Sequence, residues 1–198
     1  MRLAFLGTPE SATPSLRALV TSGHDVAVVV TRPDRRRGRA EAPSPSPVHA
    51  AALDLGLPVA HDLSAVADSG AERGVVVAYG AMVPGALLAR VPMLNVHFSL
   101  LPRGRGAAPV ERALLAGDPE TGVSIMSLEA TLDTGPVHRS LVTTVEEKSS
   151  AQLTAELAGL GAAALVEVLA DAVLLDHPSP QTGEATYAEK VRVEELHL

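Results

Sequence analysis

One short stretch, LNVHF at residues 94–98, places two polar side chains within an apolar strand pattern. Asn95 and His97 stand two positions apart, and Val96 lies between them. Because residues i and i+2 of a strand point to the same face, the amide and the imidazole are predicted to lie side by side. An amide can donate hydrogen bonds to a developing oxyanion, and an imidazole can move a proton. The pair therefore indicates carbonyl chemistry.

A carboxylate farther along the chain is a candidate third member of this group. Asp133 stands in a short loop between two predicted strands, before Thr134 and Gly135. From there it could contact the imidazole of His97 and orient it. Spacing alone does not establish that contact. A single histidine on a strand is more often a hydrogen-bonded core residue, and an aspartate before Thr-Gly is more often a turn residue.

The elements that would position these residues follow from apolar runs and turn residues. Strands are expected at 2–6, 26–30, 75–80, 93–99, 122–130 and 136–145, the last two as possible antiparallel neighbours, and a short strand is expected to begin at 57–59. Helices are expected after a cap at Thr8 and over 48–56, 84–90, 109–118 and 149–175. This order predicts an α/β fold whose first half is a doubly wound parallel sheet. Ligands of such sheets bind outside the carboxyl ends of the strands, where Asn95 and His97 lie.

Composition restricts the classes of protein further. The 198 residues are 46% hydrophobic but only 2% aromatic, so the core must be built from Val, Leu and Ala. The absence of cysteine excludes disulfides and thiolate zinc sites and fits a cytoplasmic protein. Acidic residues interrupt the longest apolar helix pattern, so no membrane span is expected. None of the seven histidines has convincing metal-ligand spacing, so no metal is expected.

A longer stretch, NVHFSLLPRGRGAAPVERALLAGDPETGVSIMSLEATLDTGPV, resembles the catalytic core of the folate-dependent formyltransferases. Further pieces match in the same order: LAFLGTPE, TRPDRRRGR with PSPV, VVVAYGAMVP and TYAEK. The resemblance covers nearly the whole chain. It implies the Rossmann-like formyltransferase fold, a mostly parallel sheet with helices on both faces. It also implies an enzyme that transfers a formyl group from 10-formyltetrahydrofolate to an amine without a metal.

The resemblance assigns roles to particular residues. The family's Asn–His–Asp set falls on Asn95, His97 and Asp133. It implies that Asn95 donates to the formyl oxygen, that His97 stabilises the intermediate and assists proton transfer, and that Asp133 keeps His97 in its working state. The folate is expected to lie against three segments, largely through backbone groups, at Tyr79, Gly80, Met82, Val83, Ser99, Leu100, Leu101, Pro102, Leu128 and Leu132.

The likeness is greatest to the bacterial members that formylate initiator methionyl-tRNA for translation initiation, in which the first long loop reaches the tRNA acceptor arm. The resemblance implies tRNA contacts within the stretch TRPDRRRGR, at Arg35, Arg36, Arg37, Gly38 and Arg39. An ordinary solvated charge run is the alternative interpretation, and the net charge of −7 argues against broad nucleic-acid binding.

Two departures from the tRNA-specific pattern keep other functions open. Ala40, Glu41 and Ala42 follow where that loop is commonly basic, and Gly104 stands where an aromatic residue is usual. Both favour a formyltransferase for a small amine, such as an amino sugar nucleotide or glycinamide ribonucleotide. A catalytically idle folate-binding domain is a third possibility. A dinucleotide-binding domain is disfavoured because FLGTPES has a single glycine.

The tRNA-specific members carry a further C-terminal barrel domain. The sequence therefore predicts that residues 1–180 form the catalytic domain and that 181–198 begin the linker to a domain absent here. The protein is expected to be a monomer.

Overall fold

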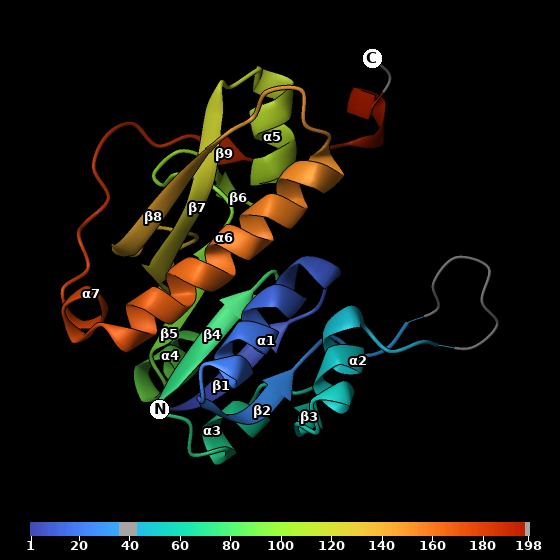
Figure 1. Ribbon diagram of the computed structural model, residues 1–198, viewed down its shortest axis with the longest axis vertical. Helices are drawn as coiled ribbons and strands as arrows, with labels where there is room; N and C mark the ends of the chain where they lie inside the picture. Colours follow the sequence, from blue (N-terminus) through green and yellow to red (C-terminus); the bar gives the residue numbers. More distant parts are fainter. Residues whose placement is uncertain (36–42, 197–198) are drawn as a thin grey trace. The chain divides into compact units, whose positions relative to one another are not determined.

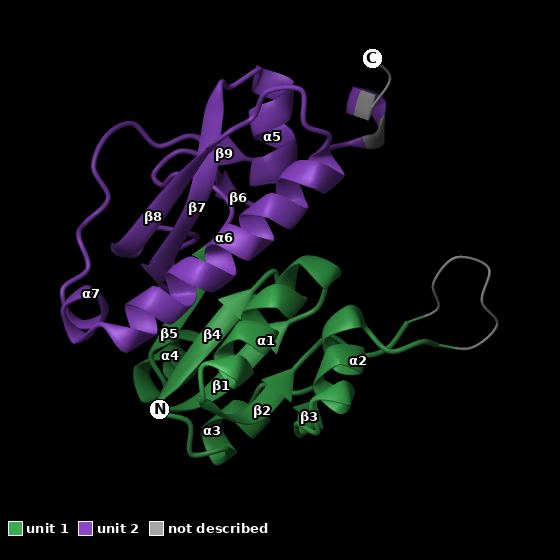
Figure 2. Cartoon of the chain, viewed as in Figure 1, with its two compact units in different colours: residues 1–96 green, residues 97–198 purple. Residues whose placement is uncertain are grey.

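The computed structural model describes residues 1–35 and 43–196 of the chain. Two compact units are present, residues 1–96 and residues 97–198, which Figure 2 colours separately. We call them unit 1 and unit 2 and describe each by itself.

Unit 1 is built on a parallel sheet (Figure 1). Its strands are β1 (Arg2–Gly7), β2 (Asp25–Val30), β3 (Val59–Ala60), β4 (Arg73–Val77) and β5 (Met93–His97), the last of which ends on the first residue of unit 2. They are hydrogen-bonded in the order β3-β2-β1-β4-β5, and every pairing among them is parallel. Strands β1, β2, β4 and β5 are apolar and largely buried, which is typical of a sheet covered on both faces.

The helices of unit 1 cover the two faces of its sheet. They are α1 (Thr13–Thr21), α2 (Pro47–Asp54), α3 (Ser64–Asp68) and α4 (Gly85–Arg90). From β1 the chain adds β2 and β3 toward one edge of the sheet, and then returns to add β4 and β5 on the other side of β1. Because crossovers between parallel strands are right-handed, this reversal moves the connecting helices to the opposite face. Helices α1 and α2 therefore share one face of the sheet, whereas α3 and α4 lie on the other. The parallel sheet of unit 1 and the antiparallel strand pair of unit 2, described below, confirm the predicted Rossmann-like, mostly parallel fold.

The beginning of the first helix differs from the sequence prediction. A 3-10 turn, η1 (Glu10–Ala12), follows β1, and α1 begins at Thr13 with a proline in its first turn. Thr8 is therefore not a helix cap. Its hydroxyl instead donates to the carbonyl oxygen of Tyr79 at 3.0 Å. This bond joins the turn after β1 to the turn after β4, at the carboxyl edge of the sheet.

Unit 2 contains an antiparallel strand pair and a small parallel pair. The elements are β6 (Arg105–Gly106), α5 (Pro109–Ala116), β7 (Glu120–Ser127), β8 (Val137–Thr144), α6 (Ser150–Ala170), α7 (Ala172–Asp176), β9 (Tyr187–Ala188) and η2 (Val193–Leu196). β7 and β8 pair antiparallel, as the sequence predicted, and β6 pairs parallel with β9. The two-residue strands β6 and β9 have no apolar pattern that could have predicted them.

The long helix α6 supplies the core of unit 2 by packing against β7 and β8. A capping box of Ser149 and Gln152 begins it, and Leu153, Leu157 and Leu165 are fully buried. It ends at Ala170, earlier than predicted, because the Asp171 carboxylate accepts the backbone N–H groups that begin α7.

By length and composition alone, α6 could also cross a membrane. Half of the relevant window is buried inside the structure, and core helices of soluble proteins pass the same test, so this is weak evidence for a span.

Residues beyond position 180, where the linker is expected to begin, contact other parts of unit 2. β9 pairs with β6, and Gln181 forms hydrogen bonds with Arg105, Asp133 and Gly135. The segment through residue 188 is therefore structurally part of unit 2 rather than a free linker.

Candidate active site

His97 is the last residue of β5, and the residue is only 6% exposed. Its Nε2 donates to the carbonyl oxygen of Gly104 at 2.8 Å. The neutral ring therefore carries its lone pair on Nδ1. Gly104 has φ +71°, and a Cβ there would lie 2.9 Å from the Cβ of Ser99. This loop conformation requires glycine, which gives a structural reason for the missing aromatic side chain.

The structure brings Asp133 to the other nitrogen of this ring. Its Oδ2 lies 3.8 Å from Nδ1 of His97 and accepts the backbone N–H of Gly106 at 2.8 Å. Asp133 is 5% exposed and has φ +51°, which is uncommon for a residue other than glycine. At 3.8 Å the two atoms are too far apart for a hydrogen bond, and the contact is an ion pair only when the ring is protonated. A proton bound at Nδ1 would lie beside the buried carboxylate of Asp133.

Asn95 lies two residues before His97 on the same strand, so the two side chains point to the same side of β5. Its backbone is paired with Val76 of β4, and the residue is 9% exposed. It stands near the carboxyl end of the parallel sheet, the edge at which open α/β sheets bind ligands.

A glutamine that the sequence analysis missed links the two loops around His97. The amide nitrogen of Gln181 donates to the carbonyl oxygens of Asp133 (2.9 Å) and Gly135 (2.8 Å). Its amide oxygen accepts from Nε and Nη2 of Arg105. Arg105 lies between Gly104, which accepts from the imidazole, and Gly106, which donates to the carboxylate. Gln181 thus connects the loop at Arg105 with the loop at Asp133, and its own hydrogen bonds are to Arg105 and to backbone carbonyl oxygens rather than to the imidazole of His97 or the carboxylate of Asp133.

Replacing Gln181 with glutamate tests this positioning role. Gln181→Glu keeps an acceptor for Arg105 but removes both N–H donors and places a carboxylate against the carbonyl oxygens of Asp133 and Gly135. We expect kcat for the formyl transfer proposed below to fall about tenfold, because small misplacements of catalytic groups are costly, with little change in KM. Steady-state kinetics would measure this.

The matched control is Gln152→Glu in the capping box of α6. Glutamate also serves at that position, so this variant should keep the wild-type kcat. A Gln181→Glu enzyme with unchanged kcat and the wild-type Tm would show that the bridge does not position the site.

The predicted folate-contacting residues occupy two sets of loops. In unit 1, the segment after β4 has buried Tyr79 and Val83, exposed Met82, and Gly80 at φ +77°. In unit 2, Ser99 to Pro102 follow β5, and Leu128 and Leu132 precede Asp133. Leu132 is half exposed, whereas the hydroxyl of Ser99 is already bonded to the Arg103 carbonyl. The contacts of these segments with folate remain a prediction.

The predicted tRNA-contacting stretch is described only at its beginning. Arg35 is exposed and bridges to Ser44 through the backbone. Arg36, Arg37, Gly38 and Arg39 lie outside the described residues, as do Ala40, Glu41 and Ala42.

The fold is of the α/β class, with a buried histidine at the end of β5 and a buried aspartate in a loop, and comparison with known proteins identifies the family. Residues 1–169 match the formyl transferase family. The chain belongs to this family.

Among its relatives are two bacterial proteins named methionyl-tRNA formyltransferase. The chain is 50% identical to that of Rhizorhabdus wittichii, over 96% of this chain and 65% of the relative. It is 48% identical to that of Novosphingobium aromaticivorans, over 100% of this chain and 69% of the relative. The chain thus spans about two thirds of the length of these relatives.

Solved structures share the fold at low sequence identity. HypX from Aquifex aeolicus in complex with tetrahydrofolic acid superposes with a TM-score of 0.77 at 15% identity, covering 100% of this chain and 31% of HypX. Glycinamide ribonucleotide transformylase 1 from Symbiobacterium toebii gives 0.71 at 21% identity, covering 85% of each chain. These likenesses support the fold.

Proposed function

We propose that this chain transfers the formyl group of 10-formyltetrahydrofolate to the amino group of initiator methionyl-tRNA. The observation that carries the proposal is the identity of about half of all positions with proteins of that name, over nearly the whole chain. The tetrahydrofolic acid complex of HypX, which has the same fold, supports folate as the donor.

The proposed chemistry assigns a role to each residue of the site. The amine nitrogen attacks the formyl carbon, and the carbonyl oxygen becomes an oxyanion that Asn95 stabilises by donating a hydrogen bond. The amine proton is held on Nδ1 of His97, next to the carboxylate of Asp133. Collapse of the intermediate breaks the bond to the folate nitrogen, which takes up the proton from Nδ1 of His97 and leaves the ring neutral again. The products are formylmethionyl-tRNA and tetrahydrofolate.

A direct assay tests the proposal. The chain is incubated with 10-formyltetrahydrofolate and, separately, with initiator methionyl-tRNA, glycinamide ribonucleotide or an amino sugar nucleotide, and both products are measured. Formylation of methionyl-tRNA supports the proposal. Transfer to a small amine alone would contradict it and assign the chain to another branch of the family. Folate binding with no transfer to any acceptor would indicate an idle binding domain.

The exposed arginine at the start of the arginine-rich stretch provides a separate test of tRNA use. We expect Arg35→Ala to raise KM for methionyl-tRNA with little change in kcat, because a phosphate contact contributes to binding rather than to chemistry. The slope of log affinity against log salt concentration should become shallower by about 1. Filter binding over a salt series measures this slope.

The control for Arg35→Ala is Arg90→Ala, which removes an exposed arginine at the end of α4 in the same unit. Its salt slope should match that of the wild type. Equal slopes for Arg35→Ala and the wild type would remove Arg35 from the tRNA interface.

A further inference from the structure

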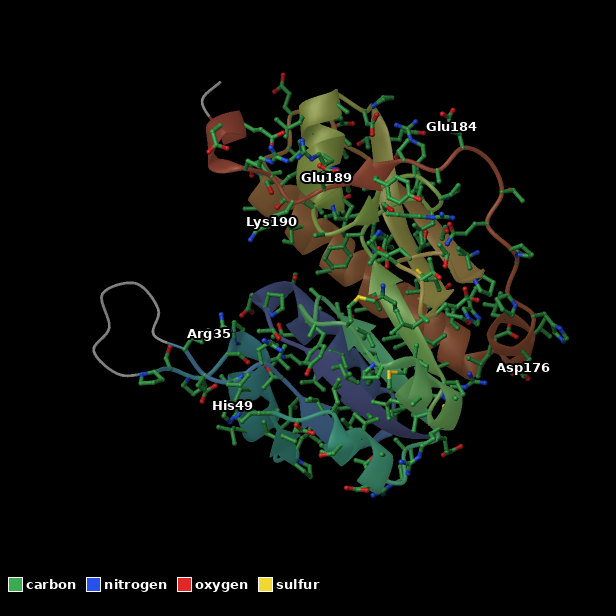
Figure 3. All side chains as sticks on the ribbon, turned by 180° about the vertical axis from the view of Figure 1, so that it is seen from behind. Arg35, His49, Asp176, Glu184, Glu189 and Lys190 are labelled. Carbon is green, nitrogen blue, oxygen red and sulfur yellow. The ribbon has the colours of Figure 1, made fainter. Side chains whose placement is uncertain are left out.

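Three side chains of unit 1, outside the candidate active site, bring metal-ligating atoms together. Asp34, His49 and His61 each offer a ligand atom, and these atoms lie within 4.8 Å of one another. No other group of three such residues in the described parts of the chain is arranged this way. Asp34 follows β2, His49 lies on α2, and His61 directly follows β3. Figure 3 shows His49 beside the segment that carries Arg35.

We propose that Asp34, His49 and His61 form a binding site for a divalent transition-metal ion such as Zn²⁺. Two imidazoles and one carboxylate are a donor set that suits zinc and related ions. Solvent or a further ligand would complete the coordination, because His61 is exposed.

The spacing of the first two donors fits adjacent metal ligands. Oδ1 of Asp34 and Nδ1 of His49 are 2.9 Å apart. At the tetrahedral angle that zinc prefers, two ligands about 2.0–2.2 Å from the ion are separated by about 3.4 Å, so these two atoms need to move apart by only about half an ångström to bind one ion. The proton of the neutral His49 ring then moves through solvent from Nδ1 to Nε2, and Nδ1 coordinates the ion.

The third donor is already oriented by the backbone. Nδ1 of His61 donates to the carbonyl oxygen of Thr31 at 3.1 Å, which leaves the lone pair of the neutral ring on Nε2. Histidines that bind metals commonly donate their other ring N–H to a carbonyl in this way. The two imidazole rings are nearly perpendicular, with centroids 5.4 Å apart, so the rings are not stacked.

The surrounding contacts hold the cluster in place before any ion binds. The hydroxyl of Ser46 accepts the His49 backbone N–H and bonds to the hydroxyl of Thr31 at 2.7 Å. The backbone N–H of Ser46 also donates to Asp34. Asp34 directly precedes Arg35, so a bound ion would lie next to that arginine in the sequence.

Calorimetric titration of the chelator-treated chain with Zn²⁺ tests the site, with Co²⁺ absorption as a second probe. We expect one equivalent of Zn²⁺ to bind, to raise Tm, and to bind at least tenfold more weakly to His61→Ala. His61 is exposed, so this variant should fold like the wild type. Asp34→Asn should likewise lose the visible Co²⁺ spectrum.

The matched control is His177→Ala, which removes an exposed histidine of unit 2 and should leave zinc affinity unchanged. Absence of Zn²⁺ binding to the wild type would overturn the proposal. Binding that survives in His61→Ala and Asp34→Asn, or that is lost in His177→Ala, would place the ion elsewhere and overturn it equally. The titration needs no formyl-transfer activity, so its outcome is separate from that of the proposed function.

Discussion

Replacing His97 with alanine should lower kcat/KM for formyl transfer by about 10²–10⁴-fold, the range that a positioned general base contributes. The imidazole is buried, bonded through Nε2 to Gly104, and faces a buried carboxylate through Nδ1. Alanine removes the atom that holds the amine proton, whereas the Asp133 carboxylate keeps its hydrogen bond from the Gly106 N–H. Single-turnover kinetics with bound 10-formyltetrahydrofolate would measure the chemical step directly.

The matched control for this variant is another buried histidine of the same unit. His138 is 8% exposed, and its ring bonds to the hydroxyl of Ser127 and to the carbonyl of Leu174. His138→Ala should lower Tm but leave kcat/KM within about threefold of the wild type, because its bonds lie outside the proposed chemistry. If both variants lose activity in proportion to stability, His97 has a structural role only.

Local sequence patterns were sufficient to predict most of the fold. The buried strands β1, β2, β4 and β5 are short apolar runs that end at turn residues, and the antiparallel pair β7–β8 was predicted as well. Where the prediction failed, a tertiary contact decided the outcome. Thr8 has the chemistry of a helix cap but bonds to Tyr79, and α1 begins later.

Functional residues were harder to predict when their partners are distant in sequence. The pairing of Asn95 with His97 followed from strand alternation, whereas Asp133 was a candidate from its loop position that only the resemblance to a family favoured over a turn residue. Gln181 carries no local signal, because its role depends on contacts with Arg105 and with the loop at Asp133.

The proposed metal site was also missed because its residues are distant from one another in the sequence. His49 and His61 lack metal-ligand spacing in the sequence. Only the parallel pairing of β2 with β3, together with the cap at the start of α2, brings them to Asp34. Spacing rules detect ligands that share one helix or one loop, and these three residues come from three different elements.

Asn95 is the only asparagine in the chain, and its replacement gives the second large expected effect. Asn95→Ala should lower kcat by about 10²–10³-fold, the usual cost of removing one oxyanion donor. The KM for 10-formyltetrahydrofolate should change little, because the hydrogen bond strengthens only when the formyl oxygen becomes negatively charged. Steady-state kinetics with methionyl-tRNA would measure both parameters.

Asn95→Asp separates the donor role of the amide from a packing role. Aspartate has nearly the same shape as asparagine, so a residue that only fills space on β5 would tolerate it better than alanine. An oxyanion donor gives the opposite order, because the carboxylate lacks the N–H and repels the negative charge that develops on the formyl oxygen. We therefore expect Asn95→Asp to be slower than Asn95→Ala at neutral pH. A faster Asn95→Asp enzyme would assign Asn95 to packing, and the oxyanion would then need a different donor.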